Sequence, residues 1–191
     1  DAGARLESVS LPSTAYAIPS YYVLAPAEAS SNLARFDGVR FGVRQSGTDI
    51  GSMYEKTRRG FGNEVKRRIM LGTYALSSGY YDEYYGTAQR ARSLVADDFA
   101  NAFEHVDVLF TPTAPTTAFE LGANTSDPLA MYLSDVFTVT ANLAGIPAMS
   151  VPVGEVEGLP VGGQVLAPWW GESAMLAAAG ALEAALVEDE A

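Results

Sequence analysis

The segment from Phe61 to Gly79 constrains the fold most, because its apolar residues recur with the spacing of a helix. With about 100° between successive residues, they share one face roughly 120° wide, the width typical of a helix that packs on a core. That face holds Phe61, Val65, Ile69, Gly72, Ala75 and Leu76. Many helices end at a glycine, and Gly79 supplies one here. The pattern therefore predicts a helix over residues 61–79 that buries this face.

Two adjacent arginines interrupt the helical pattern in different ways. Arg67 falls about 120° from Phe61 and lies off the apolar face, whereas Arg68 falls inside it. A desolvated charge without a partner is costly, so Arg68 needs one. Two interpretations stay open: an ion pair with an Asp or Glu in the core, or a pocket for an anionic ligand such as a carboxylate or phosphate. Gly72, one turn later, is expected to leave room beside Arg68.

The composition indicates a globular protein and excludes several kinds of site. Of 191 residues, 48% are hydrophobic and 18% are charged, which is enough for one domain or two small ones. The chain has no cysteine and one histidine, so disulfides, thiolate catalysis and a multi-histidine metal site are excluded. The absence of cysteine is compatible with the cytoplasm, where we expect the protein. The apolar runs are too short to span a bilayer, so we expect no membrane partner.

Charge is unevenly distributed along the chain. The net charge is −11, yet all 12 Lys and Arg lie at or before Arg92. Contacts with nucleic-acid phosphates need Lys and Arg. Nonspecific nucleic-acid binding by residues 93–191 is therefore not expected.

Helix and strand patterns are interspersed along the sequence, which predicts an α/β protein. We expect a layered fold with a mixed central sheet covered by helices, in a single domain over residues 1–191. The expected strands are 6–11, part of 36–44, 107–111, 148–153 and 161–167, the last two joined by a hairpin-like turn. The expected helices are one opening at Pro19 or Ser20, a short one within 46–59, 61–79, 80–103, 128–145 and 172–187.

The segment after Asp127 and Pro128, which are expected to cap and open a helix, is apolar nearly all round. Such a helix should be deeply buried, and its only charge is Asp135. A buried carboxylate needs a partner as much as Arg68 does. Either Arg68 and Asp135 bridge each other, or each binds one end of a zwitterion. In the second case the guanidinium binds an α-carboxylate and the carboxylate binds an α-ammonium group.

No motif in the chain supplies catalytic machinery by itself. The serine pairs at Ser30–Ser31 and Ser77–Ser78 lack a glycine-rich nucleophile loop, and no phosphate-binding GxxxxGK[ST] loop is present. We therefore expect no catalytic residue and no metal ligand in this chain.

Five sequence blocks together resemble the amidase signature family. Within it, the first two blocks are similar to the glutamine-hydrolysing subunits of bacterial aspartyl/glutamyl-tRNA amidotransferases, and the last two are shared with amidases generally. The blocks are EASSNLARFDGVRFG, GFGNEVKRRIMLGTYALSSGYYDEYY, DVLFTPTAPTTAF, DPLAMYLSDVFTVTANLAGIPAMSVP and GLPVGGQ.

The resemblance implies glutamine hydrolysis by a Ser–cis-Ser–Lys triad, which would lie upstream of Asp1. It places substrate binding in this chain. Arg68 matches the arginine that holds the substrate carboxylate, and Asp135 matches the aspartate that holds the amino group. Tyr21 matches a tyrosine near the substrate.

The resemblance also implies partners. Ammonia would pass to a partner subunit that binds misacylated tRNA and ATP with Mg²⁺, so the complex would contain the B and C subunits and this chain would need no cofactor. Two alternatives remain: a stand-alone amidase of the same superfamily, and a non-catalytic acidic interaction protein.

Overall fold

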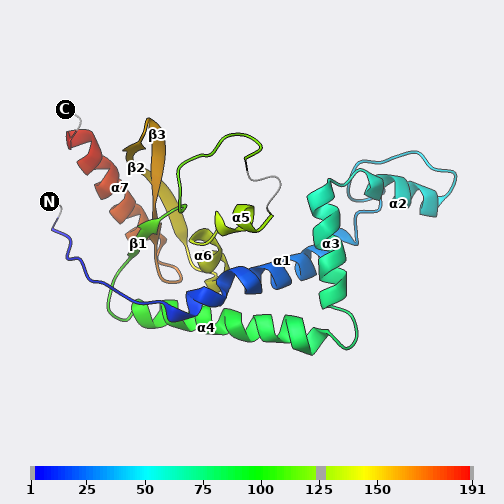
Figure 1. Cartoon of the computed structure of the whole chain (residues 1–191), viewed down its shortest axis with the longest axis horizontal. Helices are drawn as coiled ribbons and strands as arrows, with labels where there is room; N and C mark the ends of the chain where they lie inside the picture. The colour runs from blue at the N-terminus through cyan, green and yellow to red at the C-terminus, as the bar shows by residue number, and fades with distance from the viewer. Residues whose placement is uncertain (1–2, 124–127, 190–191) are drawn as a thin grey trace. The chain divides into compact units, whose positions relative to one another are not determined.

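The computed structural model describes residues 3–123 and 128–189, and the chain divides into two compact units (Figure 1). One unit combines Asp1–Ile18 with Ala91–Ala191, and the other is Pro19–Arg90. The prediction of one domain over residues 1–191 stays a prediction. In order, the elements are η1 (Pro12–Tyr16), α1 (Ala17–Leu33), α2 (Ile50–Arg59), α3 (Asn63–Ala75), η2 (Tyr81–Gly86), α4 (Thr87–Ala102), β1 (Leu109–Pro112), α5 (Pro128–Leu133), α6 (Thr138–Ala144), β2 (Ala148–Val156), β3 (Leu159–Leu166) and α7 (Glu172–Asp189).

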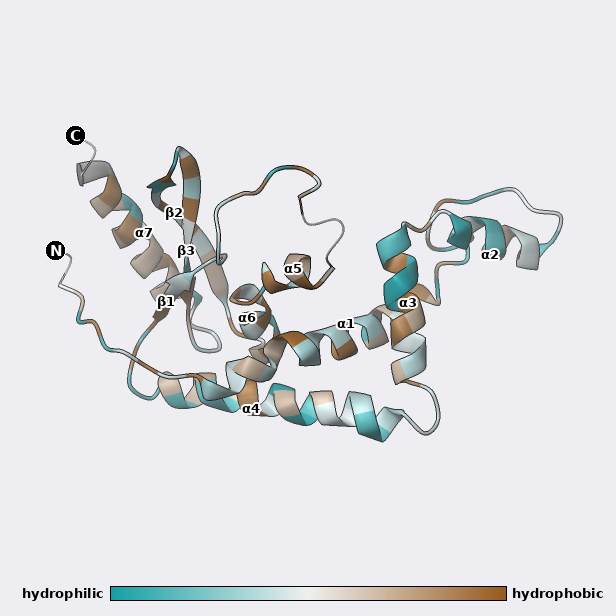
Figure 2. Ribbon diagram, in the orientation of Figure 1, coloured by the Kyte–Doolittle hydropathy of each residue, from teal (hydrophilic) through white to brown (hydrophobic). Residues whose placement is uncertain are grey.

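The helix expected over residues 61–79 is confirmed as α3, followed by a turn in which Gly79 has a φ of 95°. Its predicted apolar face is also confirmed, since every member is buried or half-buried. The exposed apolar side chains of α3 are Met70, Leu71 and Tyr74, which lie off that face. Figure 2 shows a hydrophilic first half of α3 and a mostly hydrophobic second half.

Gly72 does not leave room for a ligand, contrary to the expectation from sequence. A Cβ added to Gly72 would lie 1.9 Å from the carbonyl oxygen of Pro26 in α1. The backbone of the crossing helix α1 therefore occupies the space that a side chain at residue 72 would need. Ser30 and Thr73 add a hydroxyl–hydroxyl hydrogen bond of 2.9 Å between the same two helices. The crossing therefore sets the relative positions of Tyr22 in α1 and Arg68 in α3, which each lie one turn before it.

The other unit contains a three-stranded sheet in the order β1-β3-β2. Both strand pairs are antiparallel, so the parallel pairs of a mixed sheet are not seen among the described strands. The hairpin turn joining β2 and β3 holds Glu157 and Gly158 at φ values of 54° and 77°, as a tight hairpin requires. Helix α7 packs on β2 and β3, and the α/β class is confirmed. The core between them consists of Val151, Val165, Ala167, Met175 and Ala179.

Two expected strands are absent from the described residues. Residues 6–11 have no regular secondary structure, and residues 36–44 contain bends at 38–42. Alternation of apolar and polar residues shows that a segment can sit in a sheet, but a strand also needs a partner for its backbone groups. In the described part of the chain, neither segment pairs with another strand.

Two expected helices differ in detail. The helix expected over 80–103 begins with a π-helical segment, η2, before it continues as α4. The helix expected over 128–145 is divided into α5 and α6 by a turn at 134–137. In this turn the backbone amides donate to carbonyls three residues back instead of four: Ser134 to Met131, Asp135 to Tyr132 and Val136 to Leu133. The capping role expected for Asp127 falls outside the described residues.

Candidate functional site

Arg68 is held on its own helix by Glu64. Arg68 Nε donates to Glu64 Oε1 at 3.0 Å, with the i,i+4 spacing that brings two side chains together on a helix. The other carboxylate oxygen, Oε2, accepts from Arg67 Nη1 at 3.1 Å. The Arg68 side chain is 28% exposed and that of Arg67 is 51% exposed, which confirms their predicted placement relative to the apolar face. Arg68 therefore forms an ion pair, but its partner Glu64 is exposed on the same helix, so this is not the ion pair in the core that the sequence left open.

Helix α1 supplies two tyrosines to the same guanidinium. Arg68 Nη1 donates a long hydrogen bond of 3.4 Å to Tyr21 Oη. The Tyr22 ring lies 5.6 Å from Arg68 Cζ, within the range of a cation–π contact. The two tyrosine rings meet edge to face, with centroids 5.0 Å apart. The structure thus brings together two of the three predicted binding residues, Tyr21 and Arg68.

These contacts change the pKa of the Arg68 guanidinium. Partial burial lowers it, but the hydrogen bonds with Tyr21 and Glu64 raise it by more, so the net shift is upward. Arg68 is therefore a permanent cation, and Nη2 is the nitrogen that neither hydrogen bond uses. A planar guanidinium with a free nitrogen at its end binds a carboxylate or another small anion.

Asp135 lies in the other unit, in the turn between α5 and α6, and it is exposed. The expectation of a buried carboxylate is therefore wrong, because the all-round apolar helix is interrupted at this point. The Asp135 carbonyl accepts hydrogen bonds from the amides of Thr138 and Val139, at 3.1 and 2.9 Å. This turn therefore presents a carboxylate just before α6, and a carboxylate is the natural partner of an ammonium group.

A buried glutamine holds the Asp135 turn against the sheet. Gln164, in β3, is only 4% exposed. Its Nε2 donates to Phe137 O at 3.1 Å and to Thr111 Oγ1 at 3.2 Å. Beside it lies a hollow of about 300 Å³. The hollow is lined by Thr113, Thr138, Ala141, Asn142, Ile146, Ala148, Met149, Ser150 and Gln164. Hydroxyl and amide groups thus predominate among its polar atoms.

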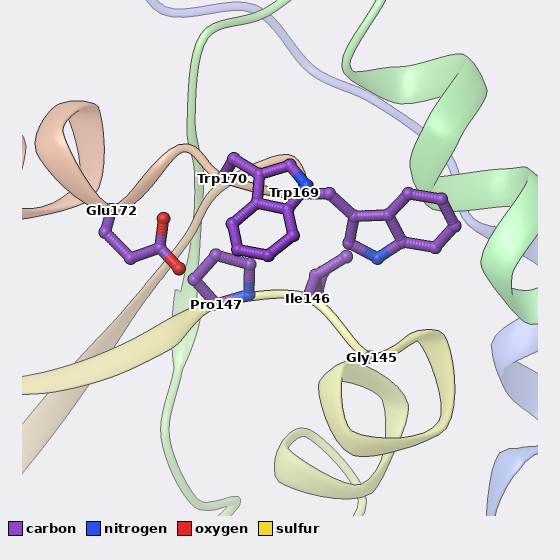
Figure 3. A pocket seen from close by; sticks show the side chains of 6 residues that line it. All are labelled: Gly145, Ile146, Pro147, Trp169, Trp170 and Glu172. Carbon is purple, nitrogen blue, oxygen red and sulfur yellow. The ribbon is translucent and has the colours of Figure 1, made fainter.

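A second hollow in this unit, of about 460 Å³, is mainly aromatic (Figure 3). Trp169 and Trp170 line it with Ile146, Pro147 and Glu172. Trp170 is 91% exposed, and its φ of 66° places it in the left-handed region. The hollow contains one acidic side chain and no base, so it does not suit an anion.

The described residues show neither a metal site nor a membrane span. In residues 3–123 and 128–189, no group of three or more His, Asp or Glu is arranged to hold a metal ion. Within the same ranges, no helix is both long and apolar enough to cross a bilayer.

Sequence reasoning missed three residues that shape these sites. Glu64 carried a signal, because it precedes Arg68 by four residues on an expected helix. Tyr22 carried a weaker one, as the neighbour of Tyr21. Gln164 carried no signal beyond its place in the block GLPVGGQ, because its two hydrogen-bond partners, Thr111 and Phe137, lie far away in the sequence.

Comparison with known proteins gives a consistent result. The family model described as Amidase matches residues 1–176. The A subunit of glutamyl-tRNA(Gln) amidotransferase from Parvibaculum lavamentivorans is 60% identical over 186 residues, which cover 96% of this chain and 38% of that protein. Its counterpart in Rubrobacter xylanophilus is 58% identical, with coverages of 97% and 39%. The chain thus spans little more than a third of these relatives.

Solved structures agree with the sequence matches. The crystal structure of the glutamyl-tRNA(Gln) amidotransferase A subunit from Thermotoga maritima is similar, with a TM-score of 0.62 and 42% identity. The match covers 88% of this chain and 32% of that one. A crystal structure described as an amidase gives a TM-score of 0.72 at 25% identity, with coverages of 95% and 38%. The resemblance found in the sequence is confirmed: this chain belongs to the amidase family.

Proposed function

We propose that the protein hydrolyses glutamine as the A subunit of a tRNA-dependent amidotransferase, and that this chain supplies glutamine recognition. The observation that carries the proposal is the Arg68 guanidinium, held by Tyr21 and Glu64 with Nη2 left for a ligand. The names of the relatives support the choice of reaction.

Glutamine recognition requires a group for each end of the amino acid. The Arg68 guanidinium binds the α-carboxylate through its end nitrogens. Tyr21 Oη accepts from Arg68 Nη1, so its own proton is available to donate to the same carboxylate. Asp135 binds the α-ammonium group. Recognition of both ends excludes simple apolar amides, which carry neither charge.

The chemistry of cleavage belongs to a Ser–cis-Ser–Lys triad outside this chain. The serine oxygen attacks the side-chain amide carbon of glutamine, the C–N bond breaks and ammonia leaves with a proton returned by the triad. Water then hydrolyses the acyl-enzyme to release glutamate. The residues of this chain hold the substrate in place during both steps.

The ammonia is consumed by partner subunits. The B and C subunits complete the complex, and one of these partners binds misacylated tRNA and ATP with Mg²⁺, in the cytoplasm. Residues 93–191 contain no Lys or Arg, which favours tRNA contact through the partner. The products are Gln-tRNA or Asn-tRNA.

Substitution of Arg68 in the full-length protein within its complex tests the proposal. Arg68→Ala should weaken glutamine-dependent transamidation by about 2–4 kcal/mol, the scale for removing one partner of a buried charge contact. Ammonia-dependent transamidation should be unchanged, because it bypasses glutamine. Arg59→Ala is the matched control, since Arg59 pairs with Glu55 at the same spacing on α2. Equal loss of both activities in Arg68→Ala would show a folding defect and contradict the assigned role.

A further inference from the structure

We propose that Glu64 is a positioning residue for glutamine binding, because it sets the orientation of the Arg68 guanidinium. The inference rests on the proposed function and extends it to a residue that does not touch the substrate. It is carried by the way the two oxygens of Glu64 are divided between two arginines.

The Glu64 carboxylate binds Arg68 at Nε. Its Oε1 accepts from Nε at 3.0 Å, while its Oε2 is engaged by Arg67 at 3.1 Å. A carboxylate with both oxygens on Arg68 would occupy two guanidinium nitrogens. The division leaves Nη2, and the second hydrogen of Nη1, at the end of the guanidinium for a second carboxylate.

The plane of the guanidinium is fixed at the same time. The Tyr22 ring lies 5.6 Å from Cζ, and Tyr21 Oη is 3.4 Å from Nη1. An arginine side chain has several rotatable bonds, and ordering it on binding would cost affinity. Glu64 removes that cost beforehand, since its bond to Nε blocks rotation of the group about its long axis.

Kinetics of two Glu64 variants in the full complex test the inference. Glu64→Ala should raise the KM for glutamine about tenfold, the effect of losing one charge-assisted hydrogen bond, and leave kcat within about twofold. Glu64→Gln keeps an oxygen that accepts from Nε, so its KM should stay within about threefold of the parent value. Ammonia-dependent activity should be unchanged in both. Glu55→Ala, which breaks the matching pair with Arg59, is the control and should alter no parameter.

The outcomes separate this inference from the function on which it rests. A normal glutamine KM in Arg68→Ala would overturn the proposed function. An effect of Arg68→Ala without one of Glu64→Ala would overturn only the positioning role. A lower KM in Glu64→Ala would show that Glu64 competes with the substrate carboxylate, and a parallel loss of the ammonia-dependent activity would show a structural role. Either result would overturn the inference.

Discussion

Gly72 of α3 lies against the carbonyl of Pro26 in α1, where any side chain would overlap the backbone of the other helix. Tyr22 precedes Pro26 by four residues and Arg68 precedes Gly72 by four, so both side chains lie one turn from the crossing. The contact between the Tyr22 ring and the guanidinium follows from this geometry. A glycine one turn further along α3 thus determines the surroundings of Arg68.

Gly72→Ala should disturb both stability and glutamine binding. The new methyl group would come within 1.9 Å of the Pro26 oxygen, so the helices must separate. We expect a loss of roughly 1–3 kcal/mol in the free energy of unfolding, the usual cost of overpacking, and a higher KM for glutamine. Urea unfolding and steady-state kinetics of the full-length protein measure the two effects.

Gly180→Ala provides the matched control, because Gly180 lies in α7 and a Cβ there meets no atom within 4 Å. Alanine is favoured over glycine in a helix by about 0.5–1 kcal/mol, so this variant should be as stable as the parent or more so. A Gly72→Ala protein of parental stability would contradict the close crossing.

Tyr21→Phe should raise the KM for glutamine without changing kcat. The variant keeps the ring and removes the hydroxyl that contacts Arg68 Nη1. This hydrogen bond is long, at 3.4 Å, so its loss corresponds to roughly 0.5–1.5 kcal/mol and a rise of about twofold to tenfold is expected. Tyr16→Phe, at an exposed tyrosine of η1, is the control. An unchanged KM would remove Tyr21 from the binding site.

Gln164→Leu should destabilise the unit that contains the sheet. The substitution removes both donors of a buried amide and leaves Phe137 O and Thr111 Oγ1 without those bonds. The expected loss is about 1–3 kcal/mol in the free energy of unfolding. Gln45→Leu, at an exposed position, should change it by no more than about 0.5 kcal/mol. Equal effects of the two substitutions would argue against the role of Gln164.

Tyr74 should make stability sensitive to alkaline pH. The Tyr80 hydroxyl beside it, and next the partial loss of hydration around its own hydroxyl, raise the pKa of the exposed Tyr74 from 10.0 to about 12. The folded state then retains a proton that the unfolded chain has released, so this contribution is complete below pH 10 and is lost as the pH approaches 12. Tyr74→Phe should therefore lose less stability over this range. Urea unfolding midpoints of the parent and of Tyr74→Phe, measured below and above pH 10, test this prediction. If the midpoints of both proteins fall equally as the pH rises, the prediction is contradicted.

The face of α3 was predictable because helical periodicity depends only on local sequence. The same periodicity separated Arg67 from Arg68, while short apolar runs joined by a turn located β2 and β3, and an alanine-rich segment located α7. The role of Gly72 was not predictable, since it depends on which helix crosses α3 and at which residue. The alternation of apolar and polar residues in 6–11 predicted a strand wrongly, because a local pattern does not show whether a second strand is available for pairing. The exposure of Asp135 was missed because the segment looks like one continuous helix in sequence, whereas its backbone changes to i→i−3 hydrogen bonds at residues 134–136.

Trp169 and Trp170 are the two tryptophans of this chain, and both are exposed in one hollow. Indole fluorescence shifts to shorter wavelength when the ring leaves water. The tryptophan emission of the chain therefore reports on a single small area of its surface. Anything that covers that hollow changes the spectrum, whereas events around Arg68 leave it unchanged unless they also alter the hollow. The two tryptophans thus serve as an intrinsic fluorescence probe of this hollow, and no added label is needed.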